Sequence, residues 1–228
     1  MNNGFQKFGA WCGFISMNVF FAGLLVGNIF PPMSPSMTGP EVQAFVQANA
    51  FGLKVCSLLI MISGAFAGIF DAVICLQLRR MEGNRPMGAY AQLALGVANI
   101  TYFVMPGVLL GVMAFRPDRN VDSLYALFDL AWLVTTFPWS VGAFQCLCCG
   151  IAILGNPQVT NVYPRWLGFF NIWIAIGMTT SSVVMFFTSG PFSWNGIVGF
   201  WIPATVFGLW MAVMWWMTLG AIKTDDGK

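Results

Sequence analysis

The chain has 228 residues, of which 58% are hydrophobic and only 8% are charged. A soluble domain is about 45–50% apolar and about 25% charged, so these charges cannot cover a water-facing surface, and a soluble enzyme or a disordered tail is excluded. Ten basic residues against eight acidic ones offer no basic patch for nucleic acid. The composition indicates an integral membrane protein surrounded by lipid.

Long runs without charge indicate where the chain crosses the membrane. A crossing helix needs about 20 mainly apolar residues, and the last run, residues 166–222, has room for two helices around the turn-forming segment 190–196. The sequence therefore predicts a single all-α membrane domain over residues 1–228. Its six predicted helices lie at residues 8–30, 52–77, 87–115, 124–153, 166–188 and 197–220.

The segment after the first helix is the longest of the predicted external segments. Pro31 and Pro32 end the first helix, and Thr38 is a candidate N-cap with Pro40 in the first turn that follows. Apolar positions from Val42 onward fall near one helical face, which is typical of an interfacial extension of the second span. We expect residues 31–51 to fold over the mouth of the bundle.

The basic residues predict the orientation. With six spans and both termini inside, the cytoplasmic segments hold more Lys and Arg than the external ones, so the positive-inside rule favours an N-in, C-in topology. The inner set is Lys7, Arg79, Arg80, Arg85, Arg165, Lys223 and Lys228, and the outer set is Lys54, Arg116 and Arg119.

Two carboxyl groups lie deep in the predicted spans. Asp71 comes eight residues before Arg79 and Asp129 seven residues after Asp122, so each lies roughly 10–12 Å inside its end of the membrane. Ionisable groups at such depth are costly and usually face protein or water. We interpret both as pathway acids for a solute. The alternative is that they only hydrogen-bond neighbouring helices or pair with a loop arginine such as Arg116.

Uncharged polar side chains in the spans could line the same path. The candidates are Asn18 in the first span, Asn99 in the third, and a hydroxyl belt in the fifth formed by Thr179, Thr180, Ser181 and Ser182; Gln92, Gln145 and Asn171 are further polar span residues. Each needs a partner or water in the bilayer core. Since hydrogen bonds between helices explain such residues as well, they allow a pore without requiring one.

Three prolines, Pro106, Pro138 and Pro203, are predicted to kink their helices. Pro106 and Pro203 are each followed by a small residue and then by a glycine five positions after the proline, which suggests inverted repeats of three spans, a common plan for transporters.

Metal and haem sites find little support in the residue types. The chain has no histidine, which excludes His-ligated haem and the usual zinc sites. Cys146, Cys148 and Cys149 form a cluster that we weigh as a soft-metal site, but Cys148 points away from the other two on a helix and no usual ligand spacing is present. We expect buried free thiols and neither a metal nor a cofactor.

Three segments, 163–173, 190–196 and 114–119, resemble a group of uncharacterised multi-span membrane proteins of actinobacteria and proteobacteria. The likeness covers roughly residues 90–220. It implies a bacterial inner-membrane location and brings no catalytic or binding residues.

Two functions are consistent with these patterns. The first is a channel or simple transporter for a small neutral or weakly acidic solute, and the alternative is a non-catalytic structural subunit of a larger membrane complex. The small residues Gly64, Ala65, Ala67 and Gly68 would let another helix approach, which favours an oligomer. We expect no enzymatic activity, because the only candidate bases, Asp71, Asp129 and Glu82, have no partner at motif spacing.

Overall fold

The computed structural model describes residues 3–156 and 161–226, and in these residues the chain is helical with connecting turns. The regular α-helices are α1 (Asn3–Val26), α2 (Gly39–Glu82), α3 (Met87–Asn99), α4 (Thr101–Phe115), α5 (Val121–Thr136), α6 (Ser140–Gly155), α7 (Arg165–Thr179) and α8 (Ile202–Asp226). Short irregular helices join some of them: the 3-10 helices η1 (Phe137–Trp139) and η2 (Thr180–Phe186), and the π-helical turn η3 (Ile197–Trp201).

Six helical segments of the described chain are long and apolar enough to cross a membrane. They are Gly4–Val26, Gly39–Glu82, Met87–Phe115, Val121–Gly155, Arg165–Phe186 and Ile197–Thr224. Each contains most of one predicted span, so the prediction of an all-α bundle of six membrane helices is confirmed. The protein is therefore a multi-pass membrane protein whose outer surface contacts lipid.

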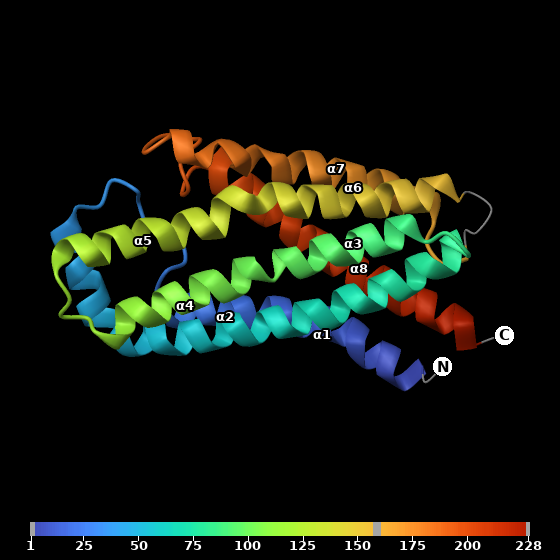
Figure 1. The fold of residues 1–228 in the computed structure, drawn as a ribbon, viewed down its shortest axis with the longest axis horizontal. Coiled ribbons are helices and arrows are strands. Elements are labelled where there is room, and N and C mark those ends of the chain that lie inside the picture. Colours follow the sequence, from blue (N-terminus) through green and yellow to red (C-terminus); the bar gives the residue numbers. More distant parts are fainter. Residues whose placement is uncertain (1–2, 157–160, 227–228) are drawn as a thin grey trace.

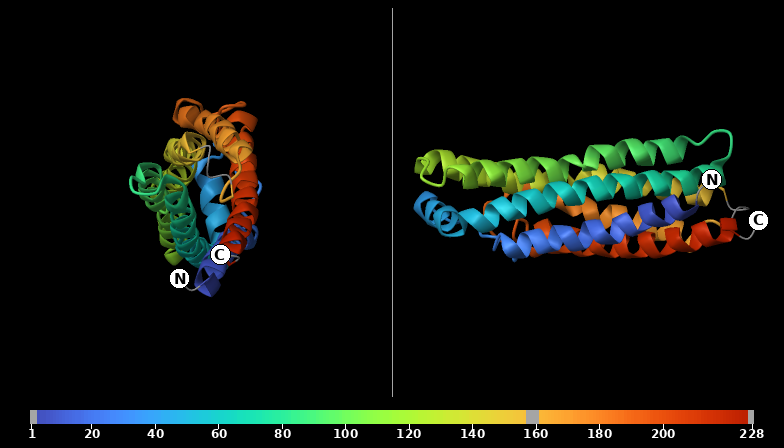
Figure 2. Two further views of the ribbon diagram at one scale, coloured as in Figure 1. Left: turned by 90° about the vertical axis from the view of Figure 1, so that its right-hand side faces the viewer. Right: turned by 90° about the horizontal axis from the view of Figure 1, so that it is seen from below.

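The helices run along the long axis of the molecule (Figure 1). The first and last helices, α1 and α8, pack against each other, and both described ends of the chain lie at the same end of the bundle (Figures 1 and 2). This arrangement fits an even number of crossings. The side of the membrane on which the termini lie remains a prediction from the loop charges.

The second span is longer than predicted because the interfacial extension and the span form one continuous helix of 44 residues. Thr38 precedes this helix, and its backbone N–H donates to the Glu41 carboxylate at 2.7 Å, which satisfies one of the free groups at a helix start. The first turns are held to neighbouring loops, since the Gln43 side-chain amide donates to the Arg119 carbonyl at 3.0 Å. These turns lie at the end of the bundle opposite both termini (Figure 1).

The three prolines occupy three different settings. Pro106 lies inside α4, and Pro138 lies in η1, where its carbonyl accepts a hydrogen bond from the Tyr102 hydroxyl. Pro203 is the second residue of α8, just after the π-helical turn η3 passes into this helix, so it lies in the first part of the span Ile197–Thr224 and not at its middle.

The small residues of α2 serve packing within the chain. A Cβ atom added at Gly64 would lie 2.8 Å from the Cβ of Phe103, and one at Gly68 would lie 2.9 Å from Cδ1 of Ile100. Because α4 and the end of α3 already occupy this face, Gly64 and Gly68 give no support to the expected oligomer.

The buried side chains form two main clusters along the bundle. One, nearer the termini, includes Ile74, Cys149 and Met214. The other, at the opposite end, includes Leu53, Phe103 and Trp132. The candidate site lies where these two clusters meet.

Candidate functional site

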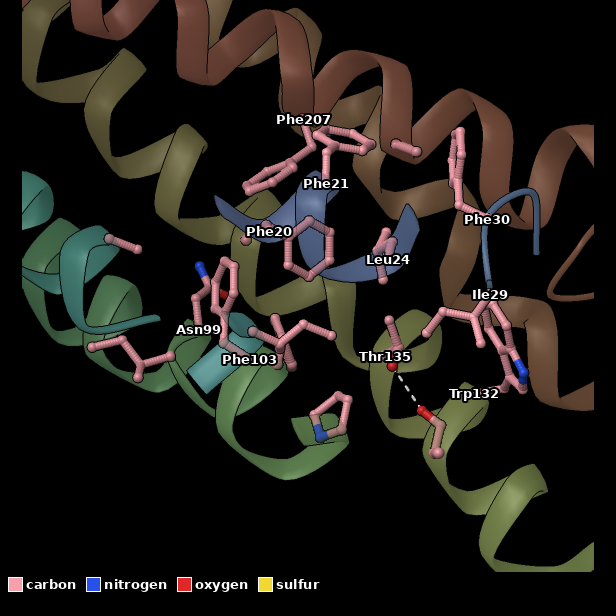
Figure 3. Close-up of a pocket in the computed structure, with 18 of the residues that line it drawn as sticks. Phe20, Phe21, Leu24, Ile29, Phe30, Asn99, Phe103, Trp132, Thr135 and Phe207 are labelled. Atoms are coloured by element: carbon pink, nitrogen blue, oxygen red, sulfur yellow. Dashed lines mark hydrogen bonds between the residues drawn. The ribbon is translucent and has the colours of Figure 1, made fainter. Parts of the chain in front are cut away.

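A cavity of about 130 Å³ lies inside the bundle, lined by residues of all eight helices α1 to α8 (Figure 3). Along α2 it is lined by Leu53, Ile60, Ala67 and Asp71, which repeat at intervals of seven and four residues and so share one helical face. At a rise of 1.5 Å per residue, Leu53 and Asp71 are about 27 Å apart along α2. The residues that line the cavity therefore extend over most of the thickness of a hydrocarbon core of about 30 Å.

Most of the cavity wall is aromatic or aliphatic. Figure 3 shows rings from separate helices around the same space, among them Phe20 and Phe21 of α1, Phe103 of α4, Trp132 of α5 and Phe207 of α8. Such a wall favours apolar groups, because each contact replaces apolar surface that would otherwise face water.

Stacked rings support this wall from behind. The indoles of Trp132 and Trp194 are nearly parallel, with ring centroids 6.4 Å apart and planes 7° apart. Trp194 is buried in the loop before η3, and its Nε1 donates to the Met33 carbonyl at 2.9 Å. The loops that contain Met33 and Trp194 thus hold Trp132 in place at the cavity wall.

Polar side chains gather at one end of the cavity, which we call the floor. Oδ1 of Asp71 accepts hydrogen bonds from Nε2 of Gln145 at 2.8 Å and from Nε2 of Gln92 at 3.3 Å. Nδ2 of Asn99 donates to Oε1 of Gln145. We call these four residues the floor cluster. Asp71 is 6% exposed, Gln145 4% and Gln92 0%, so three of them are buried, while Asn99 is half-buried.

Helix spacing and a glycine bring the floor cluster together. Gln92, Gly96 and Asn99 follow one another at four and three residues on α3 and so lie on one face. A Cβ atom added at Gly96 would lie 2.5 Å from Oδ2 of Asp71. Only a glycine lets α3 come this close to the carboxyl group of α2.

Two acceptor atoms of the floor cluster lack a donor among the described residues. Oε1 of Gln92 and Oδ1 of Asn99 are buried and have no hydrogen-bond partner among the described residues. Both hydrogen bonds to Asp71 in the described part of the chain end on Oδ1, and each of the three amide nitrogens of the cluster donates one hydrogen bond. Chemically, this arrangement suits a ligand that donates hydrogen bonds.

The structure brings together two of the predicted pathway residues, since Asp71 and Asn99 both line the cavity. Asn18 lies on the exposed side of α1, beside a separate pocket shared with α8, and its amide donates to the Phe14 carbonyl at 2.8 Å. Asp129 is half-buried on α5, where Phe128 and Ala131 rather than Asp129 line the cavity.

The predicted hydroxyl belt lies outside the lining, and three of its four hydroxyls bond to nearby backbone, whereas the buried Ser182 Oγ has no partner among the described residues. The Thr179 hydroxyl donates to the Ala175 carbonyl at 2.8 Å, and the Ser181 hydroxyl to the Met178 carbonyl at 3.2 Å. Thr180 bonds to the carbonyls of Gly177 and Val198, both at 3.0 Å, and Ser182 is half-buried. These hydroxyls join the end of α7 to η2 and η3.

Sequence reasoning identifies Gln92 and Gln145 as polar span residues but misses their pairing with Asp71. The spacing of Gln92, Gly96 and Asn99 is a signal for a polar helix face with a close approach. Nothing in the sequence shows which helix meets that face.

The cysteine cluster divides as expected from helix geometry. Cys146 and Cys149 are buried while Cys148 is half-buried, and all three thiols are free. Cys146 lines the cavity next to the floor cluster. In the described residues no group of three or more Cys, Asp or Glu side chains is arranged to hold a metal ion.

No family model, curated protein or solved structure matches this chain. The family and the bacterial groups that its motifs resemble therefore remain predictions, and the function has to be inferred from the cavity.

Proposed function

We propose that the protein is a channel or simple transporter for a small solute with an apolar body and one polar end. The observation that supports this is the shape and chemistry of the cavity, which is apolar over about 27 Å of helix and ends at the buried carboxyl group of Asp71. A cavity with a few convergent polar groups in an apolar wall is the usual form of a small-molecule site.

The charges at the cavity favour a neutral solute over an acidic one. Asp71 is the one charged residue among the described residues that line the cavity, and these include neither Lys nor Arg. An anion near this carboxylate would be repelled in surroundings of low dielectric constant. Of the two solute classes expected from the sequence, this argument disfavours the weakly acidic one.

The membrane proposed is the bacterial plasma membrane, with both termini in the cytoplasm. This rests on the resemblance of residues 90–220 to bacterial membrane proteins and on the excess of Lys and Arg in the loops assigned to the cytoplasm. In this orientation the floor cluster is nearer the cytoplasmic half, and the wall of the cavity extends toward the external end.

Solute permeability of vesicles containing the purified protein tests the proposal. We expect 1,2-butanediol to enter these vesicles faster than it enters empty ones in a stopped-flow light-scattering assay. Ala131→Phe places a ring in the cavity, because Ala131 is buried and lines it, and should reduce the rate to that of empty vesicles.

Ala126→Phe is the matched control, since Ala126 lies on the same helix with an exposed side chain. It should keep the wild-type rate. The proposal is wrong if neither 1,2-butanediol nor glycerol permeates the protein-containing vesicles faster than empty ones.

A further inference from the structure

The unmatched acceptors of the floor cluster identify the kind of group that binds there, if the cavity takes a solute as proposed. Asn99 illustrates the point: turning its amide over would place its oxygen against Oε1 of Gln145, so the present orientation, with Nδ2 donating to Gln145, is the favourable one. Its own Oδ1 is then left buried and without a donor from the described residues. A buried acceptor without a donor costs about 1–3 kcal/mol.

Asp71 is an acidic residue beside this acceptor without a donor. The residue is only 6% exposed, and it lines the cavity. The hydrogen bonds that it accepts from Gln92 and Gln145 come from neutral amides. An ionised carboxylate removed from water is costly unless a cation pairs with it. Asp71 is the one charged residue among the described lining residues, so a cation that pairs with it inside the cavity would come with the ligand.

We infer that the solute is an amine with an apolar body, bound as its ammonium ion at Asp71. The ammonium group donates to Oδ2 of Asp71 and to Oδ1 of Asn99, and the body of the solute packs against the apolar wall. This assignment names the solute class of the proposed function and rests on it.

The rings next to the floor cluster favour the same ligand. Phe70 directly precedes Asp71, Phe103 lies one helical turn after Asn99, and Trp210 also lines the cavity. Aromatic faces attract cations, and this attraction is strongest where water is excluded. A neutral alcohol would meet the same rings without this gain and would bring a single donor.

Three probes of nearly equal size separate the possibilities: 2-phenylethylamine, 2-phenylethanol and phenylacetate. Their binding is measured by isothermal titration calorimetry to the full-length protein in lipid nanodiscs, with protein-free nanodiscs as the blank. We expect the amine to bind at least tenfold more tightly than the alcohol, and phenylacetate to bind more weakly than either.

Asp71→Asn removes the charge and keeps an oxygen that can accept from Gln145, so the fold is expected to persist. In this variant the preference for the amine over the alcohol should fall below threefold. Asp129→Asn is the control, because it removes a half-buried carboxyl group outside the cavity lining, and it should leave the tenfold preference intact.

The possible failures are distinct. Equal binding of amine and alcohol to the wild-type protein overturns the amine assignment and leaves the proposed function standing. A tenfold preference that persists in Asp71→Asn shows that Asp71 is not the recognition group. If none of the three probes binds to the wild-type protein, both the amine assignment and the proposed solute cavity are wrong. This outcome does not depend on whether the variants fold.

Discussion

The side-chain amide of Gln145 lies 2.8 Å from the carboxylate of Asp71, although the two residues are 74 positions apart in the sequence. This hydrogen bond joins α6 to α2, and Gln92 and Asn99 extend it to α3. It lies where the apolar cavity meets the densely packed half of the bundle nearer the termini. The same contacts therefore contribute to stability and shape the floor of the cavity.

Gln145→Leu should destabilise the protein by about 3 kcal/mol. The substitution takes away the 2.8 Å donor to Asp71 and leaves the Asn99 amide without its acceptor, and buried groups that lose partners cost about 1–3 kcal/mol each. The free energy of unfolding is measured by reversible denaturation in mixed detergent micelles. Asn18→Leu, which changes an exposed side chain bonded only within its own helix, should change it by less than about 0.5 kcal/mol. A Gln145→Leu variant as stable as the wild type would show that the floor cluster does not hold the helices together.

Gly64→Ala should cost about 1–3 kcal/mol, the usual cost of overpacking. The added methyl group would lie 2.8 Å from the Cβ of Phe103, where two helix backbones are in close contact. Gly220→Ala is the same substitution at a position with nothing within 4 Å of the added atom. It should be neutral or stabilise α8 by up to about 1 kcal/mol. The same unfolding assay compares the two, and equal effects would contradict the close packing of α2 and α4.

Trp210→Phe should destabilise the protein by about 1–3 kcal/mol. The indole Nε1 of Trp210 donates to Oδ1 of Asn171 at 2.8 Å in a buried contact between α8 and α7, and phenylalanine cannot replace this donor. Trp216→Phe on the same helix alters a side chain that is 65% exposed and should have little effect. Thermal unfolding followed by near-ultraviolet circular dichroism compares the two variants, and an equal loss from both would argue against the Asn171 contact as the cause.

The predicted orientation is tested by labelling single exposed cysteines in intact cells. Ser36 and Asn84 are exposed and lie in loops at opposite ends of α2. In a Cys148→Ala background, where the remaining native cysteines are buried, a membrane-impermeant maleimide should label Ser36→Cys at once and Asn84→Cys only after permeabilisation. The reverse pattern would place both termini outside.

The six spans could be predicted because the bilayer imposes a simple constraint. Charged residues stay out of the hydrocarbon core, so the gaps between them outline the helices. This reasoning missed where the second helix begins. The extension before the second span is part of the same helix, since a capped helix that starts at Gly39 meets no break before Glu82.

The site was predictable only in part. Depth in the membrane identifies Asp71, and polarity identifies Asn99, without any knowledge of packing. The same argument applies equally to Asn18 and Asp129, and the structure places both outside the cavity lining. Which face of each helix points inward depends on contacts between distant segments, such as the close approach of Gly96 to Asp71, and a single sequence does not record these.

The most direct test is a crystal structure of the protein with 2-(4-bromophenyl)ethylamine, in which anomalous scattering locates the bromine atom. We predict one bromine position inside the cavity beside the ring of Phe103, with the amine nitrogen within hydrogen-bonding distance of Asp71. Bromine found only outside the bundle, at a concentration that saturates binding, would contradict a solute site at Asp71.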